Sequence, residues 1–274
     1  MSCYLIYFFV SQQKDNAMKK LTLYLVVGVA LLGCGGDDDP NSSSNPDPNP
    51  DPNTSVKLMP GFYTGTTNEG EVLDGLVDDD SRMWFTYAEV AGGEEEVIGF
   101  LTTNSPVLLN NSNFSVPARN YPYDNRGSQE TTTNGTYKLN VITGTILEMA
   151  SKSIEYTLNF NTASFKKHTL NLIDSKTFTG PLYVTSGIGA AEATIVFTTN
   201  GNFTGEDSKG CKISGKFTPA VSERYYTTSV TFGQIQCIAA GETLTGVSIL
   251  DDGNTDLLIL GTNSSGDRGM YFGN

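Results

Sequence analysis

Four cysteines and one histidine carry most of the distinctive chemistry in this 274-residue chain. Cys34 ends the run Leu31-Leu32-Gly33-Cys34, which follows Met18-Lys19-Lys20 and an apolar stretch. A basic start, a short apolar stretch and small residues before a cut site are the parts of a secretory signal peptide. With cysteine at the cut, the pattern predicts a lipoprotein signal peptide over residues 18–33 and a lipid-carrying Cys34.

The segments on either side of Cys34 agree with this interpretation. The apolar stretch is too short to cross a bilayer, which takes about 20 helical residues. Residues 1–17 do not fit a signal peptide, so we expect translation to start at Met18. Residues 34–57 are rich in Pro, Asp, Asn and Ser, which predicts an unfolded, semi-rigid tether. Gly35 stands where many inner-membrane lipoproteins carry Asp, so by that resemblance we expect the outer membrane, on the periplasmic face or the cell surface.

Cys211 and Cys237 remain as a pair once Cys3 and Cys34 are set aside. In an oxidising compartment an even pair predicts a disulfide, which should stabilise the fold by about 3 kcal/mol. Two cysteines and one histidine cannot supply the four ligands of a structural zinc site. No cofactor-binding loop occurs either, so we expect neither a metal nor a cofactor.

His168 and the acidic turns are the remaining candidates for catalysis or ion binding. Ser164, Lys166 and Asp174 lie near His168, but no Gly-x-Ser-x-Gly motif surrounds any serine, so we expect a solvated surface histidine. The run 251–256 resembles a calcium loop only superficially, and an Asp-Gly hairpin turn explains it. The other carboxylates also gather in turns, which gives no paired acids for glycoside hydrolysis.

The elements that must position these residues are strands. Apolar residues alternate with polar ones in Ile154 to Phe160, Ile213 to Phe217 and Tyr226 to Phe232, and in a strand through Tyr137, Leu139 and Val141. Turn signals lie between such runs at Asn134-Gly135, Asn200-Gly201 and Asp252-Gly253. Only Gly187 to Ala193 suggests a short helical turn. The sequence therefore predicts an all-β fold, an antiparallel meander barrel or sandwich.

An internal similarity suggests two related β units, which we place at residues 58–165 and 166–274. Gly70 to Leu76 aligns with Gly241 to Val247, and both lead into acidic turns and apolar strands. Chance similarity between Gly-rich hairpins is the alternative.

The net charge and the aromatic residues indicate which kinds of partner the chain could bind. Without residues 1–33 the chain has 14 basic and 29 acidic side chains, a net charge of −15, which disfavours nucleic-acid binding. Tyr121, Tyr123, Tyr225 and Tyr226 lie in or beside loops, where exposed tyrosines supply anchors for a protein partner. Core packing is the alternative for each of them.

The stretch Ala193 to Gly246, with Gly210-Cys211-Lys212-Ile213-Ser214-Gly215 and the later Cys237, resembles a group of proteobacterial lipoproteins without assigned activity. Gly61 to Thr67 is similar to a Gly-x-Tyr/Trp-x-Gly-Thr strand of that group. The resemblance implies a β-rich, disulfide-bonded envelope lipoprotein and supplies no catalytic residues. A two-part β plan is also similar to surface lipoproteins that bind host transferrin or complement factors, by analogy alone.

We therefore expect a non-enzymatic binding or structural module, anchored to the membrane through its lipid, with an unidentified ligand. Two alternatives remain open: an envelope enzyme or enzyme inhibitor, and a protein that binds a small apolar ligand inside a β-barrel.

Overall fold

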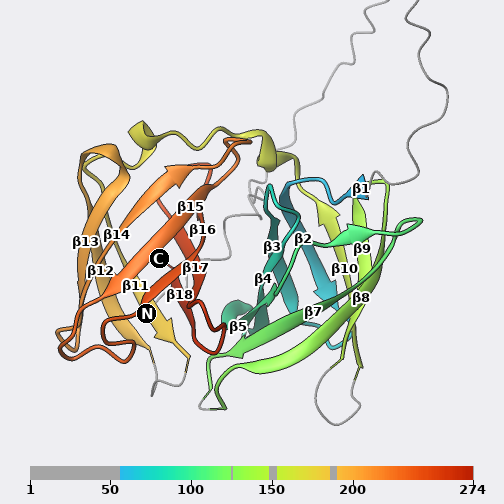
Figure 1. Ribbon diagram of the computed structural model, residues 1–274, viewed down its shortest axis with the longest axis horizontal. Helices are drawn as coiled ribbons and strands as arrows, with labels where there is room; N and C mark the ends of the chain where they lie inside the picture. Colours follow the sequence, from blue (N-terminus) through green and yellow to red (C-terminus); the bar gives the residue numbers. More distant parts are fainter. Residues whose placement is uncertain (1–55, 125, 148–152, 186–189, 274) are drawn as a thin grey trace, which may run out of the picture. The chain divides into compact units, whose positions relative to one another are not determined.

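The computed structural model describes residues 56–124, 126–147, 153–185 and 190–273, and over these ranges the chain is all-β. Two antiparallel eight-stranded sheets each close into a barrel (Figure 1). No helix in these ranges is long and apolar enough to cross a membrane. The predicted signal peptide, Cys34 and the tether up to residue 55 lie outside the described residues.

The N-terminal barrel is an up-and-down meander in which β10 returns to β2, with Tyr156 opposite Thr67 and Phe160 opposite Tyr63. A separate short pair, β1 (Val56–Lys57) and β6 (Leu108–Leu109), lies outside the barrel sheet, so the last two residues assigned to the tether form a strand. The barrel strands are β2 (Gly61–Thr67), β3 (Val72–Val77), β4 (Met83–Ala91), β5 (Glu94–Thr103), β7 (Asn113–Pro122), β8 (Gln129–Lys138), β9 (Val141–Leu147) and β10 (Ser153–Phe160).

The C-terminal barrel repeats this plan and closes where Leu182 of its first strand pairs with Phe272 of its last. The 3₁₀ helices η2 (Thr162–Phe165) and η3 (Leu170–Leu172) lie in the connection between the barrels, and η4 (Thr199–Gly201) joins β12 to β13. The strands are β11 (Thr177–Val184), β12 (Ala191–Phe197), β13 (Asn202–Asp207), β14 (Lys212–Pro219), β15 (Tyr226–Phe232), β16 (Thr243–Leu250), β17 (Leu257–Thr262) and β18 (Gly269–Gly273).

Alternating side chains fill both barrels. In β10, Ile154, Tyr156 and Leu158 are buried while Glu155 and Thr157 are exposed, and β14 and β15 also alternate. The all-β prediction and these three strands are therefore confirmed. The core of the C-terminal barrel is strongly aromatic, with Phe178, Phe197, Phe203, Phe217, Tyr226, Phe232 and Phe272.

Glycines opposite large aromatic rings make this filling possible. In both barrels an aromatic ring lies over the glycine opposite it on the neighbouring strand. The residue under the ring is glycine because a larger side chain there would collide with the ring. A Cβ atom on Gly75 would lie 2.0 Å from the Phe85 ring, and one on Gly99 would lie 2.1 Å from the Tyr87 hydroxyl. The pairs are Gly75–Phe85, Gly99–Tyr87, Gly135–Phe114, Gly144–Tyr156 and Gly215–Phe203.

Three local predictions were wrong. Gly135 lies within β8, where it makes room for Phe114, so Asn134-Gly135 is not a turn. The turn instead falls at Leu139-Asn140, where both residues have positive φ (51° and 65°) and the Leu139 side chain is 97% exposed. The predicted single strand through Tyr137, Leu139 and Val141 is therefore two strands, because β8 ends at Lys138 and β9 begins at Val141. Of the predicted helical turn at 187–193, the residues from Ala191 onward belong to β12, and residues 186–189 lie outside the described part of the chain.

The two barrels share one buried apolar cluster, which joins them within one compact unit. Three consecutive strands of each barrel supply most of it, β3–β5 and β16–β18. Leu76, Trp84, Ala88, Val97 and Phe100 pack with Val247, Ile249, Leu258, Leu260 and Tyr271.

The internal similarity seen in the sequence falls on these same strands. Leu73 and Leu244 both belong to a barrel core, whereas Leu76 and Val247 both belong to the shared cluster. The matching strands are second to fourth in one barrel but sixth to eighth in the other. The similar segments are therefore the strands through which each barrel packs against the other.

Hydrogen bonds fix which ends of the barrels correspond. We call the end where β2 begins the near end and the opposite end the far end. At the near end, the N–H of Asp79 donates to the Tyr225 hydroxyl over 3.0 Å. At the far end, the Tyr121 hydroxyl donates to the Gly266 carbonyl over 2.6 Å.

Candidate functional site

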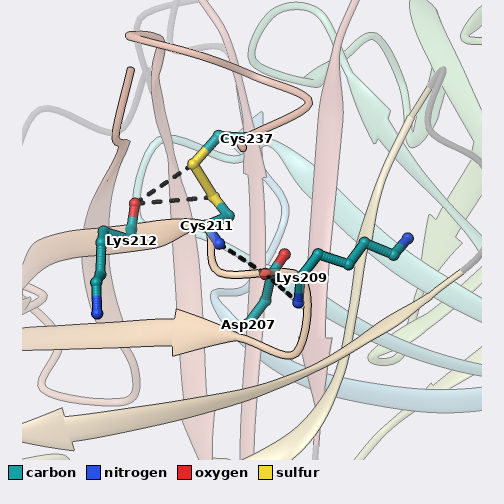
Figure 2. Close-up of a disulfide and its surroundings, with 5 residues drawn as sticks. All are labelled: Asp207, Lys209, Cys211, Lys212 and Cys237. Atoms are coloured by element: carbon teal, nitrogen blue, oxygen red, sulfur yellow. Dashed lines mark hydrogen bonds between the residues drawn. A yellow bond between two sulfur atoms is a disulfide. The ribbon is translucent and has the colours of Figure 1, made fainter. Parts of the chain in front are cut away.

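Cys211 and Cys237 form the predicted disulfide, with an S–S distance of 1.98 Å and Cα atoms 4.7 Å apart. Figure 2 shows the bond beside the turn that joins β13 to β14. The Asp207 carboxylate accepts the N–H groups of Lys209 and Cys211, at 2.9 and 2.8 Å, and so shapes that turn. The carbonyl oxygen of Lys212 lies 3.5 Å from the Cys237 sulfur.

The disulfide holds the β15–β16 loop as a cap over the far end of the C-terminal barrel. Ala239 of this loop is fully buried in the barrel core, and Cys237 packs against it. The N–H of Gly233 donates to the Lys212 carbonyl over 2.8 Å, a second tie between the loop and β14. The role of the bond is therefore structural.

Three of the four tyrosines that were candidates for contact with a partner are buried. They therefore pack in the protein core, which was the alternative to partner contact. Tyr121, Tyr225 and Tyr226 are 1%, 3% and 0% exposed. The Tyr121 ring stacks on Phe100 with centroids 4.5 Å apart, and the Tyr226 hydroxyl donates to the Thr169 carbonyl over 2.8 Å. Only Tyr123 keeps part of its surface accessible.

The prediction of a solvated His168 was wrong, because the connection between the barrels folds inward and its side chain is 0% exposed. Its Nε2 accepts the N–H of Leu250 over 3.2 Å, and its Nδ1 lies 3.3 Å from the Lys166 carbonyl. The rings of Phe62 and Tyr226 meet it edge-on. Burial lowers the pKa of His168 below its ordinary value, so the ring is neutral and joins the connection to the C-terminal barrel.

Asp251 organises the turn that resembled a calcium loop. Its carboxylate accepts the N–H groups of Gly253, Thr255 and Asp256 at 2.9, 2.6 and 2.9 Å. These oxygens already have protein donors, as in an Asx-type turn. Across the described residues, no group of three or more His, Cys, Asp or Glu side chains is arranged to hold a metal ion.

A groove of about 330 Å³ opens at the far end of the N-terminal barrel, and we call it the tyrosine groove. The Tyr123 ring stacks on Tyr183 of the other barrel, with centroids 4.4 Å apart and planes 13° apart. Its hydroxyl oxygen is buried and has no hydrogen-bond partner among the described residues. The groove is lined by Tyr87, Glu89, Glu96, Val97, Ile98, Pro122, Tyr123, Asp124, Arg126 and Tyr183.

A β-bulge shapes one wall of the tyrosine groove. The β4–β5 register shifts between Tyr87 and Ala88, which leaves Ile98 as the extra residue. The Ile98 carbonyl accepts the N–H of Tyr123 over 2.9 Å, so the bulge positions the stacked ring. Bulges often occur beside functional sites because they redirect side chains.

The tyrosine groove carries more negative than positive charge. Glu89, Glu96 and Asp124 are exposed in it, against one cation, Arg126. That guanidinium is paired with Asp124 over 2.6 Å. Glu89 and Glu96 face each other directly across β4 and β5, and neither has a cationic partner among the residues described. Burial and the neighbouring tyrosines raise the pKa of Tyr123, so its hydroxyl remains protonated.

The interior of the N-terminal barrel holds a smaller cavity of about 40 Å³ at the same end. Its walls include Leu73, Phe85, Tyr87 and Tyr156, and the Tyr87 hydroxyl donates to Asn120 Oδ1 over 2.7 Å. An engineered cavity that binds benzene measures about 150 Å³. This space therefore fits water-sized groups and not a ring.

The sequence did not predict the tyrosine groove, because its carboxylates were expected to gather in turns, whereas Glu94, Glu95 and Glu96 begin strand β5. The sequence contained one indication of this acidic pair: a two-residue hairpin turn at Gly92-Gly93 places Glu89 opposite Glu96. The contact between Tyr123 and Tyr183 depends on how the two barrels pack, which no local pattern specifies.

No family model, curated protein or solved structure matches this chain.

Proposed function

We propose that this protein is an envelope lipoprotein, held in the outer membrane through Cys34, whose two-barrel body is a non-enzymatic binding module. The single observation that carries the binding role is the tyrosine groove. Its volume lies within the range of about 300–1,000 Å³ typical of ligand sites, and it combines aromatic side chains with carboxylates that have no cationic partner in the described residues.

The architecture supports a division of labour between the barrels. The C-terminal barrel is filled with aromatic rings and capped by a disulfide-held loop. It also supplies Tyr183 to the groove. In this proposal the C-terminal barrel stabilises the groove, and the N-terminal barrel supplies the charged residues that contact the ligand.

Two features favour binding over catalysis. Both ring nitrogens of His168 lie against backbone groups of residues 166 and 250, so the histidine has no nitrogen directed toward a substrate. Ser164, four residues before His168, is also buried, and its hydroxyl donates to the Asn161 carbonyl over 2.5 Å and accepts the N–H of Phe62 over 2.6 Å.

The anchor can be tested by metabolic labelling with palmitate in the producing bacterium. We expect label on the wild-type protein and none on Cys34→Ala, which should leave the membrane fraction. Equal labelling and membrane retention of Cys34→Ala would refute the anchor.

The binding role can be tested by placing a photo-crosslinking amino acid in the full-length protein in cells. At Asp124, in the tyrosine groove, we expect a discrete crosslinked product. At the matched exposed position Ser115, on β7, we expect none. A groove position that gives no product, or the same products as Ser115, would refute the proposal.

A further inference from the structure

We infer that the tyrosine groove binds the guanidinium group of an arginine side chain presented by a basic partner protein. This inference rests on the proposed function and identifies the chemistry of its ligand.

The first argument is the charge of the facing strands. Glu89 and Glu96 are directly opposite in the β4–β5 register, and like charges in that position destabilise a strand pair. The described residues supply no cation for either of them. A cation bound between them would relieve the repulsion, and an anion would increase it. The whole chain, with a formal net charge of −13, also favours approach of a basic partner.

The second argument is the aromatic wall. Tyr87, Tyr123 and Tyr183 line the same groove as the two glutamates. A guanidinium is planar, stacks on aromatic faces and donates paired hydrogen bonds to carboxylates, whereas an ammonium offers a point charge. The chain already uses such stacking elsewhere, with the Arg82 guanidinium carbon 4.8 Å from the Trp84 ring centroid.

The third argument is the cation already present. Arg126 lines the groove and pairs with Asp124 over 2.6 Å. This pair shows that a guanidinium and a carboxylate fit together at this edge, and it leaves Glu89 and Glu96 as the carboxylates for an incoming arginine. A volume of about 330 Å³ suits a side chain with its neighbouring backbone and not a folded domain, so only the arginine and the residues next to it enter the groove.

The test uses the full-length lipoprotein in nanodiscs and a fluorescein-labelled Gly-Arg-Gly-Arg-Gly peptide, followed by fluorescence anisotropy. We expect saturable binding that the double variant Glu89→Gln/Glu96→Gln weakens at least tenfold. The control Glu155→Gln/Glu192→Gln makes the same change in net charge at exposed positions outside the groove and should weaken binding less than twofold. The citrulline peptide should not bind, and the lysine peptide should bind at least fivefold more weakly.

Three results would overturn the inference: no binding of the arginine peptide, equal losses in the two double variants, or equal binding of the lysine and arginine peptides. Equal losses would mean that net charge alone attracts the peptide. The crosslinking experiment separates this inference from the proposed function. A specific Asp124 crosslink without arginine binding would refute only the ligand class, whereas loss of both would refute the binding role as well.

Discussion

Removing the disulfide should cost the fold several kilocalories per mole. The bond joins residues 26 apart in sequence, and the chain-entropy relation for a loop of that length gives about 3.5 kcal/mol at 25 °C. For a domain of 150–250 residues, each kcal/mol shifts Tm by about 2–4 °C, so the expected decrease is about 7–14 °C. Because the barrels share a buried cluster, we expect one unfolding transition to move as a whole.

The measurement is urea unfolding followed by circular dichroism, with oxidised wild type, reduced wild type and Cys211→Ala/Cys237→Ala compared. Alanine is preferred to serine because Cys211 is buried, and a hydroxyl there would add its own cost of desolvation. Reduction leaves both sulfur atoms in place and so controls for lost packing. If reduced wild type loses less than about 1 kcal/mol, the entropic argument for this loop is refuted.

Three further predictions concern buried groups and glycine packing. Because burial lowers the pKa of His168 in the fold, the contribution of His168 to the free energy of unfolding should be fully present above about pH 6.5 and should be lost as the pH falls toward the folded-state pKa. Urea melts of His168→Gln should lack this part of the pH dependence. Burial, followed by the charge of Glu95, raises the pKa of Asp74 to about 7, so the unfolded chain loses this proton first and the contribution of Asp74 to stability declines from about pH 4 to 7. Asp74→Asn should therefore raise Tm at pH 8 and leave it unchanged at pH 3, and a decrease at pH 8 would contradict the argument. Gly135→Ala should cost about 1–3 kcal/mol in urea melts, because the new Cβ would lie 2.4 Å from the Thr143 carbonyl oxygen; wild-type stability would show that the strands can separate freely.

The sequence predicted strands most reliably where burial on one face enforces alternation. Ile154 to Phe160 shows this, because each inward residue fills the barrel and each outward one meets solvent. Glycine was harder to interpret, because the same residue serves turns and close contacts. Gly201 lies in a turn with positive φ, whereas Gly135 lies within a strand beneath an aromatic ring. Only the position of Phe114 on the neighbouring strand distinguishes the two uses.

Residues whose surroundings depend on contact between the barrels could not be placed from sequence. His168 lies in a polar stretch, so local composition predicts exposure, but residues 250 and 226 of the C-terminal barrel and Phe62 of the N-terminal barrel enclose it. Tyr123 and Tyr225 look alike in sequence, yet Tyr225 is buried against Asp79 and Tyr123 borders a groove. The disulfide was accessible to reasoning because two cysteines allow a single intramolecular pairing.

The order in which the strands pair has a consequence for how the chain folds as it emerges from its N-terminus. Every strand pairing described in the two barrels joins neighbours in the meander except the closing pairs, β10 with β2 and β11 with β18. Because the N-terminal part of the chain is the first to emerge, the first barrel can close once Phe160 is free to pair, before the second barrel has formed. The second must wait for Gly269 to Gly273, although Cys211 and Cys237 can bond earlier and hold its central hairpin together. A chain stopped before residue 269 would therefore carry one finished barrel beside an open sheet with two unpaired edges, the form most prone to aggregate.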